Sequence, residues 1–181
     1  MKKKISSKFY ILLLLAFLFA APGISALWLF KHPDWLASSK LNKGKLLNPP
    51  LALETLDIQN KWRIVYWSPK TCDNACFKQL DTLARVRLAL GRRLYEVDQW
   101  LILGEKAEPL NEEMQNLIKE RDFHVAQLAA NEENNLPIKA KVFLANSDKY
   151  LILSYTTAFN PDDVFKDLKL LLNTTQNKSG T

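Results

Sequence analysis

One stretch of sequence decides the fold: residues 62–76, WRIVYWSPKTCDNAC. Its first six residues are β-branched or aromatic at almost every position, which predicts a strand, and their continuous apolar character favours a central strand with both faces covered. Ser68-Pro69 ends this strand. The two cysteines of the chain, Cys72 and Cys76, follow at the start of a helical pattern that extends to about Leu90. The stretch therefore predicts a strand that leads a pair of thiols to the rim of a sheet.

The spacing of the cysteines indicates chemistry. Residues four apart share one face of a helix, so the sulfurs of Cys72 and Cys76 can point the same way. A thiolate at a helix N-terminus is stabilised by the helix dipole. The pair could form a disulfide that takes part in redox chemistry, or hold a soft metal such as Cu(I). The alternative is a structural disulfide or two inert thiols.

Downstream, helical and strand patterns alternate. A closing hairpin is predicted by two β-rich runs that flank the turn residues 146–149. The last helix has a capping residue in Asn160 and a proline, Pro161, at its first position. The order β-α-β-α-β-β-α predicts an α/β fold with a mixed sheet flanked by helices. After the first strand and helix, the predicted elements are strand 99–103, helix 109–120, strand 123–128, strands 141–145 and 150–155, and a helix from 161.

Upstream, residues 9–30 contain no charged side chain. About 20 apolar residues suffice for a helix to cross a membrane, so this run predicts one N-terminal transmembrane helix. Lysines 2, 3, 4 and 8 precede it, and the positive-inside rule then keeps the N-terminus in the cytoplasm and the rest of the chain outside. A cleaved signal peptide is the alternative. Both interpretations export the domain.

The predicted organisation has five segments: a basic N-terminus (1–8), the transmembrane helix (9–30), an extended linker (31–50), one domain (51–173) and a flexible tail (174–181). The net charge is +6, but without the four N-terminal lysines the chain has 21 basic against 19 acidic residues. This near balance argues against nucleic acid as a partner.

The chain also resembles a known family. The strand 62–67, the loop 68–71 and the C-x-x-x-C pair are similar to the SCO-type, thioredoxin-fold proteins of cytochrome c oxidase assembly. In particular, residues 83–91 and 167–171 resemble a bacterial single-pass membrane branch of these proteins. The resemblance spans roughly residues 40–172. It implies a thioredoxin-like domain in the periplasm, anchored in the bacterial inner membrane.

The resemblance implies a possible copper site as well. The SCO-type family binds copper through its two cysteines and a histidine just before the hairpin, which makes Cys72 and Cys76 the candidate Cu(I) ligands. Residues 136–139 contain no histidine, so His124, further upstream, is the candidate third ligand. The other histidine, His32, lies beside the predicted membrane helix. The proline that usually follows the first cysteine is replaced by Asp73.

These observations lead to three hypotheses about function. In the first, the protein assists cytochrome c oxidase assembly, with Cys72 and Cys76 carrying copper or reducing the oxidase's copper-site cysteines. Its partners are then the lipid bilayer and the oxidase subunits. In the second, it is a general extracytoplasmic thiol–disulfide oxidoreductase. In the third, it is a non-catalytic accessory subunit of a respiratory oxidase. Enzymatic and non-enzymatic functions both stay open.

Overall fold

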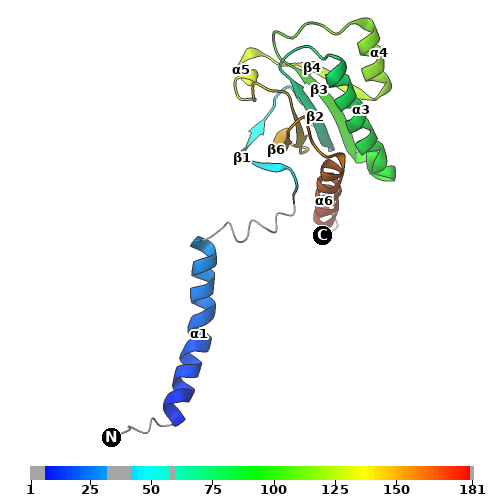
Figure 1. The fold of residues 1–181 in the computed structure, drawn as a ribbon. Helices are drawn as coiled ribbons and strands as arrows, with labels where there is room; N and C mark the ends of the chain where they lie inside the picture. Colours follow the sequence, from blue (N-terminus) through cyan, green and yellow to red (C-terminus); the bar gives the residue numbers. More distant parts are fainter. Residues whose placement is uncertain (1–6, 32–41, 58–59, 180–181) are drawn as a thin grey trace. The chain divides into compact units, whose positions relative to one another are not determined.

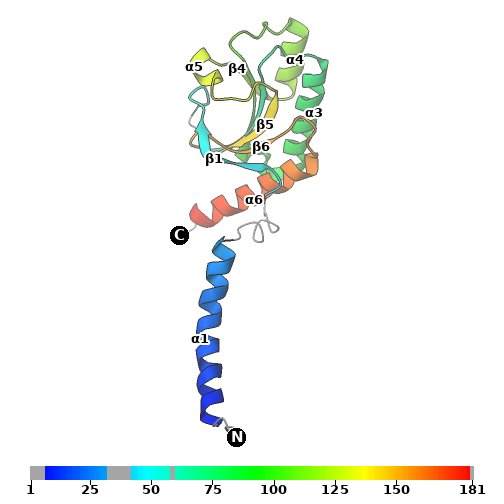
Figure 2. The same cartoon turned by 60° about the vertical axis from the view of Figure 1, so that its left-hand side comes forward.

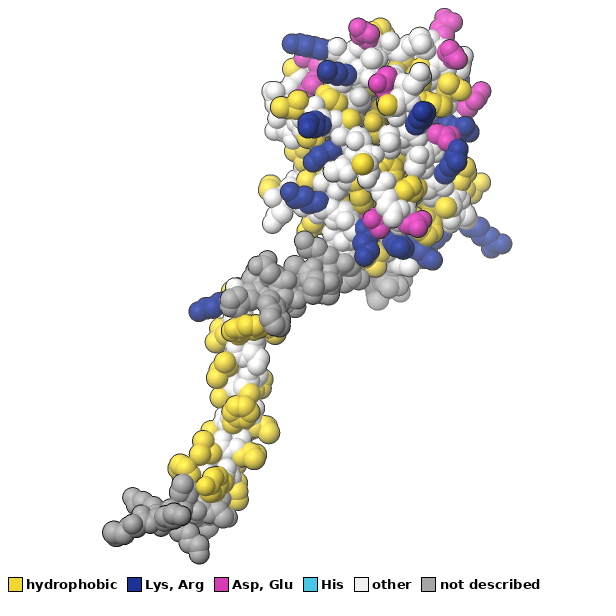
Figure 3. Space-filling view, in the orientation of Figure 1, with side chains coloured by type: hydrophobic (Ala, Val, Ile, Leu, Met, Phe, Trp, Pro, Cys, Tyr) yellow, Lys and Arg dark blue, Asp and Glu magenta, His cyan; other side chains and the backbone are white. Residues whose placement is uncertain are grey.

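The structure is a computed structural model that describes residues 7–31, 42–57 and 60–179. The chain divides into two units, residues 1–41 and 42–181. In the first, a single helix is described, α1 (Ser7–Lys31), with apolar side chains along its visible face (Figure 3). Its 23 residues from Phe9 to Lys31 are long and apolar enough to cross a membrane. At 1.5 Å per residue they extend about 35 Å, against a hydrocarbon core of about 30 Å.

The second unit is built on a six-stranded mixed sheet (Figures 1 and 2). Its strand order is β1-β6-β5-β2-β3-β4. Strands β2, β3 and β4 are parallel to one another, whereas β5 is antiparallel to β2, and β6 and β1 continue the antiparallel half. The strands are β1 (Lys45–Ala52), β2 (Trp62–Ser68), β3 (Val97–Leu103), β4 (Phe123–Gln127), β5 (Lys141–Ala145) and β6 (Tyr150–Tyr155). The predicted central strand, mixed sheet and closing hairpin are confirmed.

The longer helices of this unit share one face of the sheet. The helices are α3 (Asn74–Ala89), α4 (Glu112–Glu120) and α6 (Pro161–Ser179), with the short α5 (Ala130–Glu133) and the 3₁₀ helix η1 (Gly91–Glu96). Leu83 of α3, Ile118 of α4 and Leu168 of α6 belong to one buried cluster with Ile64 of β2. A second cluster covers the other face, where Val65 packs with residues of the loops: Leu53, Leu56, Leu128 and Leu136. Both faces of β2 are therefore buried, as its continuous apolar sequence predicts.

Two predicted boundaries differ from the structure. The predicted linker, residues 31–50, contains most of β1, which pairs with β6 at the edge of the sheet. Pro49 and Pro50 favour an extended linker, but prolines, which lack the N–H donor, are also tolerated in edge strands, and the pairing of β1 is irregular between Leu46 and Leu51. The predicted tail, residues 174–181, is helical as far as Ser179, where α6 ends.

A buried carboxylate fastens β1 to α6. Asp167 of α6 is 1% exposed. Both of its oxygens accept the N–H of Lys43 at 2.8 Å, and its Oδ2 also accepts the N–H of Gly44 at 2.7 Å and the hydroxyl of Tyr155 at 2.6 Å. A Cβ on Gly44 would lie 2.5 Å from the Tyr155 ring, so the chain approaches this closely because residue 44 is glycine. We call these four residues the Asp167 clamp.

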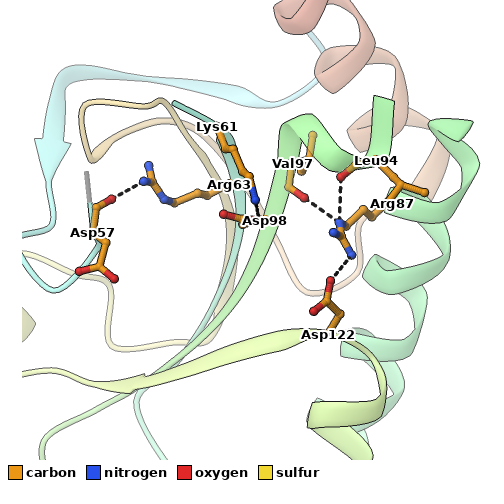
Figure 4. Close-up of polar contacts among 8 residues, drawn as sticks. All are labelled: Asp57, Lys61, Arg63, Arg87, Leu94, Val97, Asp98 and Asp122. Carbon is orange, nitrogen blue, oxygen red and sulfur yellow. Dashed lines mark hydrogen bonds and ion pairs between the residues drawn. The ribbon is translucent and has the colours of Figure 1, made fainter. Parts of the chain in front are cut away.

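Buried arginines hold together the end of the sheet where β2 and β3 begin (Figure 4). Arg63 is fully buried and donates to the carbonyl oxygens of Asn146, at 2.7 Å, and Asp57. Burial lowers the pKa of Arg63, and the charges of Asp98 and Asp57 oppose this effect. Arg87 lies in the last turn of α3 and donates to the carbonyl oxygen of Val97 at 2.6 Å. These cations serve the packing at the end of β2 opposite to the cysteines.

We expect the second unit to lose stability in alkaline solution through Tyr155. Burial, followed by the hydrogen bond to Asp167, raises the pKa of this phenol far above its ordinary value. Above about pH 10 the unfolded chain therefore releases a proton that the folded chain retains. This contribution to stability is fully present below about pH 10 and falls by up to ~1.4 kcal/mol per pH unit above it.

Urea unfolding of the full-length protein in detergent, followed between about pH 8 and about pH 11, measures this loss. Lysines and the other tyrosines also titrate in this range, so the comparison is with Tyr155→Phe. This variant should be less stable below about pH 10 but should lose stability less steeply above it. Equal slopes for the two proteins would contradict the assignment to Tyr155.

Candidate functional site

The two cysteines lie between the central strand β2 and the first turn of α3, the helix that follows it. After β2 ends at Ser68, the chain crosses to α3, which begins at Asn74. Cys72 therefore precedes the helix, whereas Cys76 lies in its first turn. The predicted start of the helix at Cys72 is two residues too early, because Asp73 is extended and caps the helix. Its Oδ1 accepts the N–H of Cys76 at 2.9 Å.

Cys72 and Cys76 are joined in a disulfide, with their Cα atoms 5.2 Å apart. The two residues are 6% and 5% exposed and belong to the buried cluster beneath α3, together with Tyr66 and Leu80. The two sulfurs are thus held side by side at the rim of the sheet, although only one of the cysteines is on the helix. A disulfide at this place can exchange with a partner's thiol, provided that one sulfur can be reached from outside.

A cavity lies beside α3 at this disulfide. It has a volume of about 460 Å³, and Cys76 is the cysteine that lines it. Tyr66 of β2, Asp73, and Lys139 of the loop before β5 form part of its wall. The neighbouring Ile138 is 93% exposed. The cavity therefore places polar groups around Cys76 and an apolar side chain at its rim.

The phenol of Tyr66 is influenced by the capping carboxylate. Burial raises the pKa of Tyr66, and the negative charge of Asp73 raises it further. Tyr66 therefore stays a neutral hydroxyl to a higher pH than an ordinary tyrosine, in the wall of the cavity that Cys76 also lines. The sequence pattern places Tyr66 in the strand, and its role in the wall of the cavity follows only from the fold.

The loop before the cysteines is positioned by a close backbone contact. Gly104, directly after β3, donates its N–H to the carbonyl oxygen of Ser68 at 2.9 Å. A Cβ on Gly104 would lie 2.6 Å from the carbonyl oxygen of Pro69. This separation is too short for any side chain, so the glycine lets β3 approach the turn that leads to Cys72.

Comparison with known families identifies the domain. A family model described as "Transmembrane-like, thioredoxin-like, C-terminal domain" matches residues 62–175, which is more than half of the chain. The chain belongs to this family. Its mixed sheet flanked by helices is therefore a thioredoxin-like fold. An apolar N-terminal helix precedes it. The predicted fold class is confirmed.

Several solved structures are similar to this thioredoxin-like domain. Apo Sco1 from Thermus thermophilus is 17% identical, with a TM-score of 0.51, over 72% of this chain and 96% of that protein. ScoI from Arabidopsis thaliana, with copper bound, is 13% identical, with a TM-score of 0.49, over 70% and 98%. A secreted disulfide oxidoreductase of Mycobacterium tuberculosis is 16% identical, with a TM-score of 0.43, over 62% and 84%. At 17% identity the likeness to Sco1 concerns the fold alone. No curated protein matches the chain.

The histidine expected as a third copper ligand lies on the other face of the sheet. His124 of β4 is paired in register with Trp100 of β3, and their rings stack with centroids 4.9 Å apart. Trp100 belongs to the cluster opposite to the one that holds both cysteines. The structure therefore does not bring His124 to Cys72 and Cys76. His32 lies outside the described residues.

The side chains in place do not fit a three-ligand copper site. Among residues 7–31, 42–57 and 60–179, no group of three or more histidines, cysteines or acidic residues could hold a metal ion. The sulfurs of Cys72 and Cys76 are bonded to each other, and a thiolate has to be free to bind Cu(I). Copper binding by this chain stays a prediction from the sequence resemblance, testable by titrating the reduced protein with Cu(I).

Sequence reasoning alone misses the role of Asp73 at the site. Asp73 stands out in the sequence as the residue that replaces a family proline, and not as the helix cap. The signal is nevertheless present, because an aspartate directly before a run with helical apolar spacing is a frequent N-cap. Cys72 and Cys76 are predicted as a pair, and the structure pairs them.

Proposed function

We propose that this protein is a membrane-anchored thiol–disulfide exchange protein whose domain lies on the non-cytoplasmic side of the membrane. The observation that carries the proposal is the Cys72–Cys76 disulfide, which is held at the rim of a thioredoxin-like sheet with Cys76 next to a cavity. The apolar helix α1 supports the anchoring. The four N-terminal lysines support the orientation, with the domain in the periplasm of a bacterium.

The disulfide and the neighbouring cavity support the following exchange. In the reduced protein, the thiolate of Cys76 attacks a disulfide of the partner from the cavity, forms a mixed disulfide and releases one partner thiolate, which takes up a proton. The Cys72 thiolate then attacks Cys76 Sγ, re-forms the internal disulfide and releases the second partner thiol. Two electrons pass to the partner, and the pair is oxidised.

We further propose that the partner is a subunit of cytochrome c oxidase and that its disulfide is formed by the copper-site cysteines. The support is the sequence resemblance to SCO-type assembly proteins and the membrane anchor, which keeps the domain near an integral membrane target. In this role the protein would prepare the oxidase cysteines for copper by reducing them. A general extracytoplasmic oxidoreductase is the alternative, with the same exchange but many partners.

Trapping the mixed disulfide tests both parts of the proposal. Cys72→Ser in the full-length membrane protein removes the resolving thiol, so Cys76 should remain linked to its partner. Cys76→Ser is the matched control, and we expect less linked product from it, because Cys76 is the cysteine that lines the cavity. Non-reducing gels and mass spectrometry of the membrane fraction identify what is linked.

The possible outcomes separate the hypotheses. Oxidase subunits linked to Cys72→Ser support the assembly function, and many unrelated partners support the general oxidoreductase. The absence of linked product in both variants, with oxidase assembly retained when both cysteines are serine, would favour the non-catalytic accessory subunit. Protease digestion of sealed spheroplasts tests the orientation, because the proposed topology exposes the domain and predicts its cleavage.

A further inference from the structure

A carboxylate occupies the end of α3 that would otherwise stabilise a thiolate. The N-terminus of a helix carries a partial positive charge and unpaired N–H groups, and these lower the pKa of a nearby cysteine. In this chain the Cys76 N–H is already bonded to Asp73 Oδ1 at 2.9 Å. Asp73 directly follows Cys72 and lines the same cavity as Cys76. A negative charge therefore stands at the residue that follows Cys72 and is hydrogen-bonded to the backbone of Cys76.

Other charged groups face this place. Lys70 and Lys139 line the cavity and favour a thiolate, whereas Asp73 disfavours it. Of these three residues, Asp73 is the one whose side chain is hydrogen-bonded to the turn that carries Cys76. The charge of Asp73 also reaches into the cavity, since it contributes to the raised pKa of Tyr66.

We infer that Asp73 shifts the redox equilibrium of the Cys72–Cys76 pair toward the disulfide, so that the reduced protein is a stronger reductant than the pair would be without this charge. The physical reason is that the reduced pair bears partial thiolate charge and the disulfide bears none, so a fixed neighbouring carboxylate raises the free energy of the reduced form alone. The inference rests on the proposed function and gives its direction: electrons leave this protein.

The equilibrium can be written with glutathione as the probe. One glutathione thiolate attacks a sulfur of the Cys72–Cys76 bond, which breaks, and the released sulfur takes up a proton. A second glutathione thiolate attacks the mixed disulfide and releases the other cysteine, which is also protonated. Two glutathione thiols are oxidised to one glutathione disulfide, while the protein gains two electrons and two protons.

The deciding variant is Asp73→Asn. Asparagine caps a helix about as well as aspartate, so the hydrogen bond to Cys76 is kept and only the charge is removed. We expect the equilibrium constant to shift toward the dithiol by about 3- to 10-fold at about pH 8, which corresponds to ~15–30 mV. The reduced fraction of full-length protein in detergent is measured by alkylation after equilibration in glutathione buffers.

Two controls isolate the charge effect. Asp148→Asn removes one carboxylate from the hairpin turn between β5 and β6, at the opposite end of the sheet from the disulfide. It should leave the equilibrium unchanged. The urea midpoint of oxidised Asp73→Asn should fall only slightly, through the lost interaction of the charge with the helix dipole, whereas lost helix structure would lower it much further.

The outcomes distinguish this inference from the proposed function. If the wild type equilibrates with glutathione and Asp73→Asn gives the same constant, or one shifted toward the disulfide, the role of Asp73 is overturned and the exchange function stands. If the wild-type disulfide does not equilibrate with glutathione at all, the exchange function itself fails.

Discussion

Replacing Asp167 with alanine is expected to destabilise the thioredoxin-like domain by about 3–5 kcal/mol. The substitution removes the acceptor for two backbone N–H groups and one hydroxyl, of Lys43, Gly44 and Tyr155. The hydrogen bonds from the Gly44 N–H and the Tyr155 hydroxyl are buried. Without the carboxylate, these two donors would lose their acceptor. Each unsatisfied buried donor costs about 1–3 kcal/mol.

Urea unfolding of the full-length protein in detergent, followed by tryptophan fluorescence, measures this effect. Tyr155→Phe keeps the ring against Gly44 and loses only one hydrogen bond to Asp167, so about 1–2 kcal/mol is expected. Lys166→Ala removes a surface side chain of the same helix and should change stability by less than ~0.5 kcal/mol. A loss of less than ~1 kcal/mol in Asp167→Ala would show that the clamp does not hold β1.

The Asp167 clamp fixes the segment directly before β1 to α6 and β6. Hydrogen exchange provides a second measurement that does not depend on global unfolding. In Asp167→Asn the amides of β1 should exchange faster, while those of β2 and β3 stay protected.

Local patterns are sufficient to predict most of the fold. The strand at 62–67 and the hairpin over 141–155 are encoded by runs of apolar and turn residues within a few positions of each other, and the structure confirms them. The edge strand β1 escapes prediction because its pairing depends on β6, more than 90 residues away. Pro49 and Pro50 indicate an extended backbone, but they do not indicate that this segment pairs with another strand. The partner strand can be found only when the register of the whole sheet is known.

The candidate site shows the same division between local and long-range information. The cysteine pair and the following helix are adjacent in sequence, so their association can be predicted. The position of His124 cannot, because the face on which a strand residue lies depends on register, and a shift of one residue reverses it. The cavity beside Cys76 is also beyond prediction, since Lys139 comes from a loop more than 60 residues away.

Gly104 allows the end of β3 to lie close to the loop that leads to Cys72. We expect Gly104→Ala to destabilise the domain by about 2–3 kcal/mol, because its Cβ would lie 2.6 Å from the Pro69 carbonyl oxygen, which belongs to the backbone and cannot rotate away. Relief of this clash moves β3 from Ser68 and weakens the 2.9 Å hydrogen bond between them. The same shift should displace the turn that leads to Cys72 and change the glutathione equilibrium of the disulfide.

Gly91→Ala separates this clash from a general effect of losing a glycine. Gly91 has a φ of +61°, and a Cβ added there would have no neighbouring atom within 4 Å, so alanine costs only the left-handed backbone conformation, about 1 kcal/mol. Its glutathione equilibrium should match that of the wild type. Urea unfolding and glutathione equilibration of both full-length variants in detergent make the comparison. If Gly104→Ala lost no more stability than Gly91→Ala and kept the wild-type redox equilibrium, the contact with Pro69 would not be what positions the cysteines.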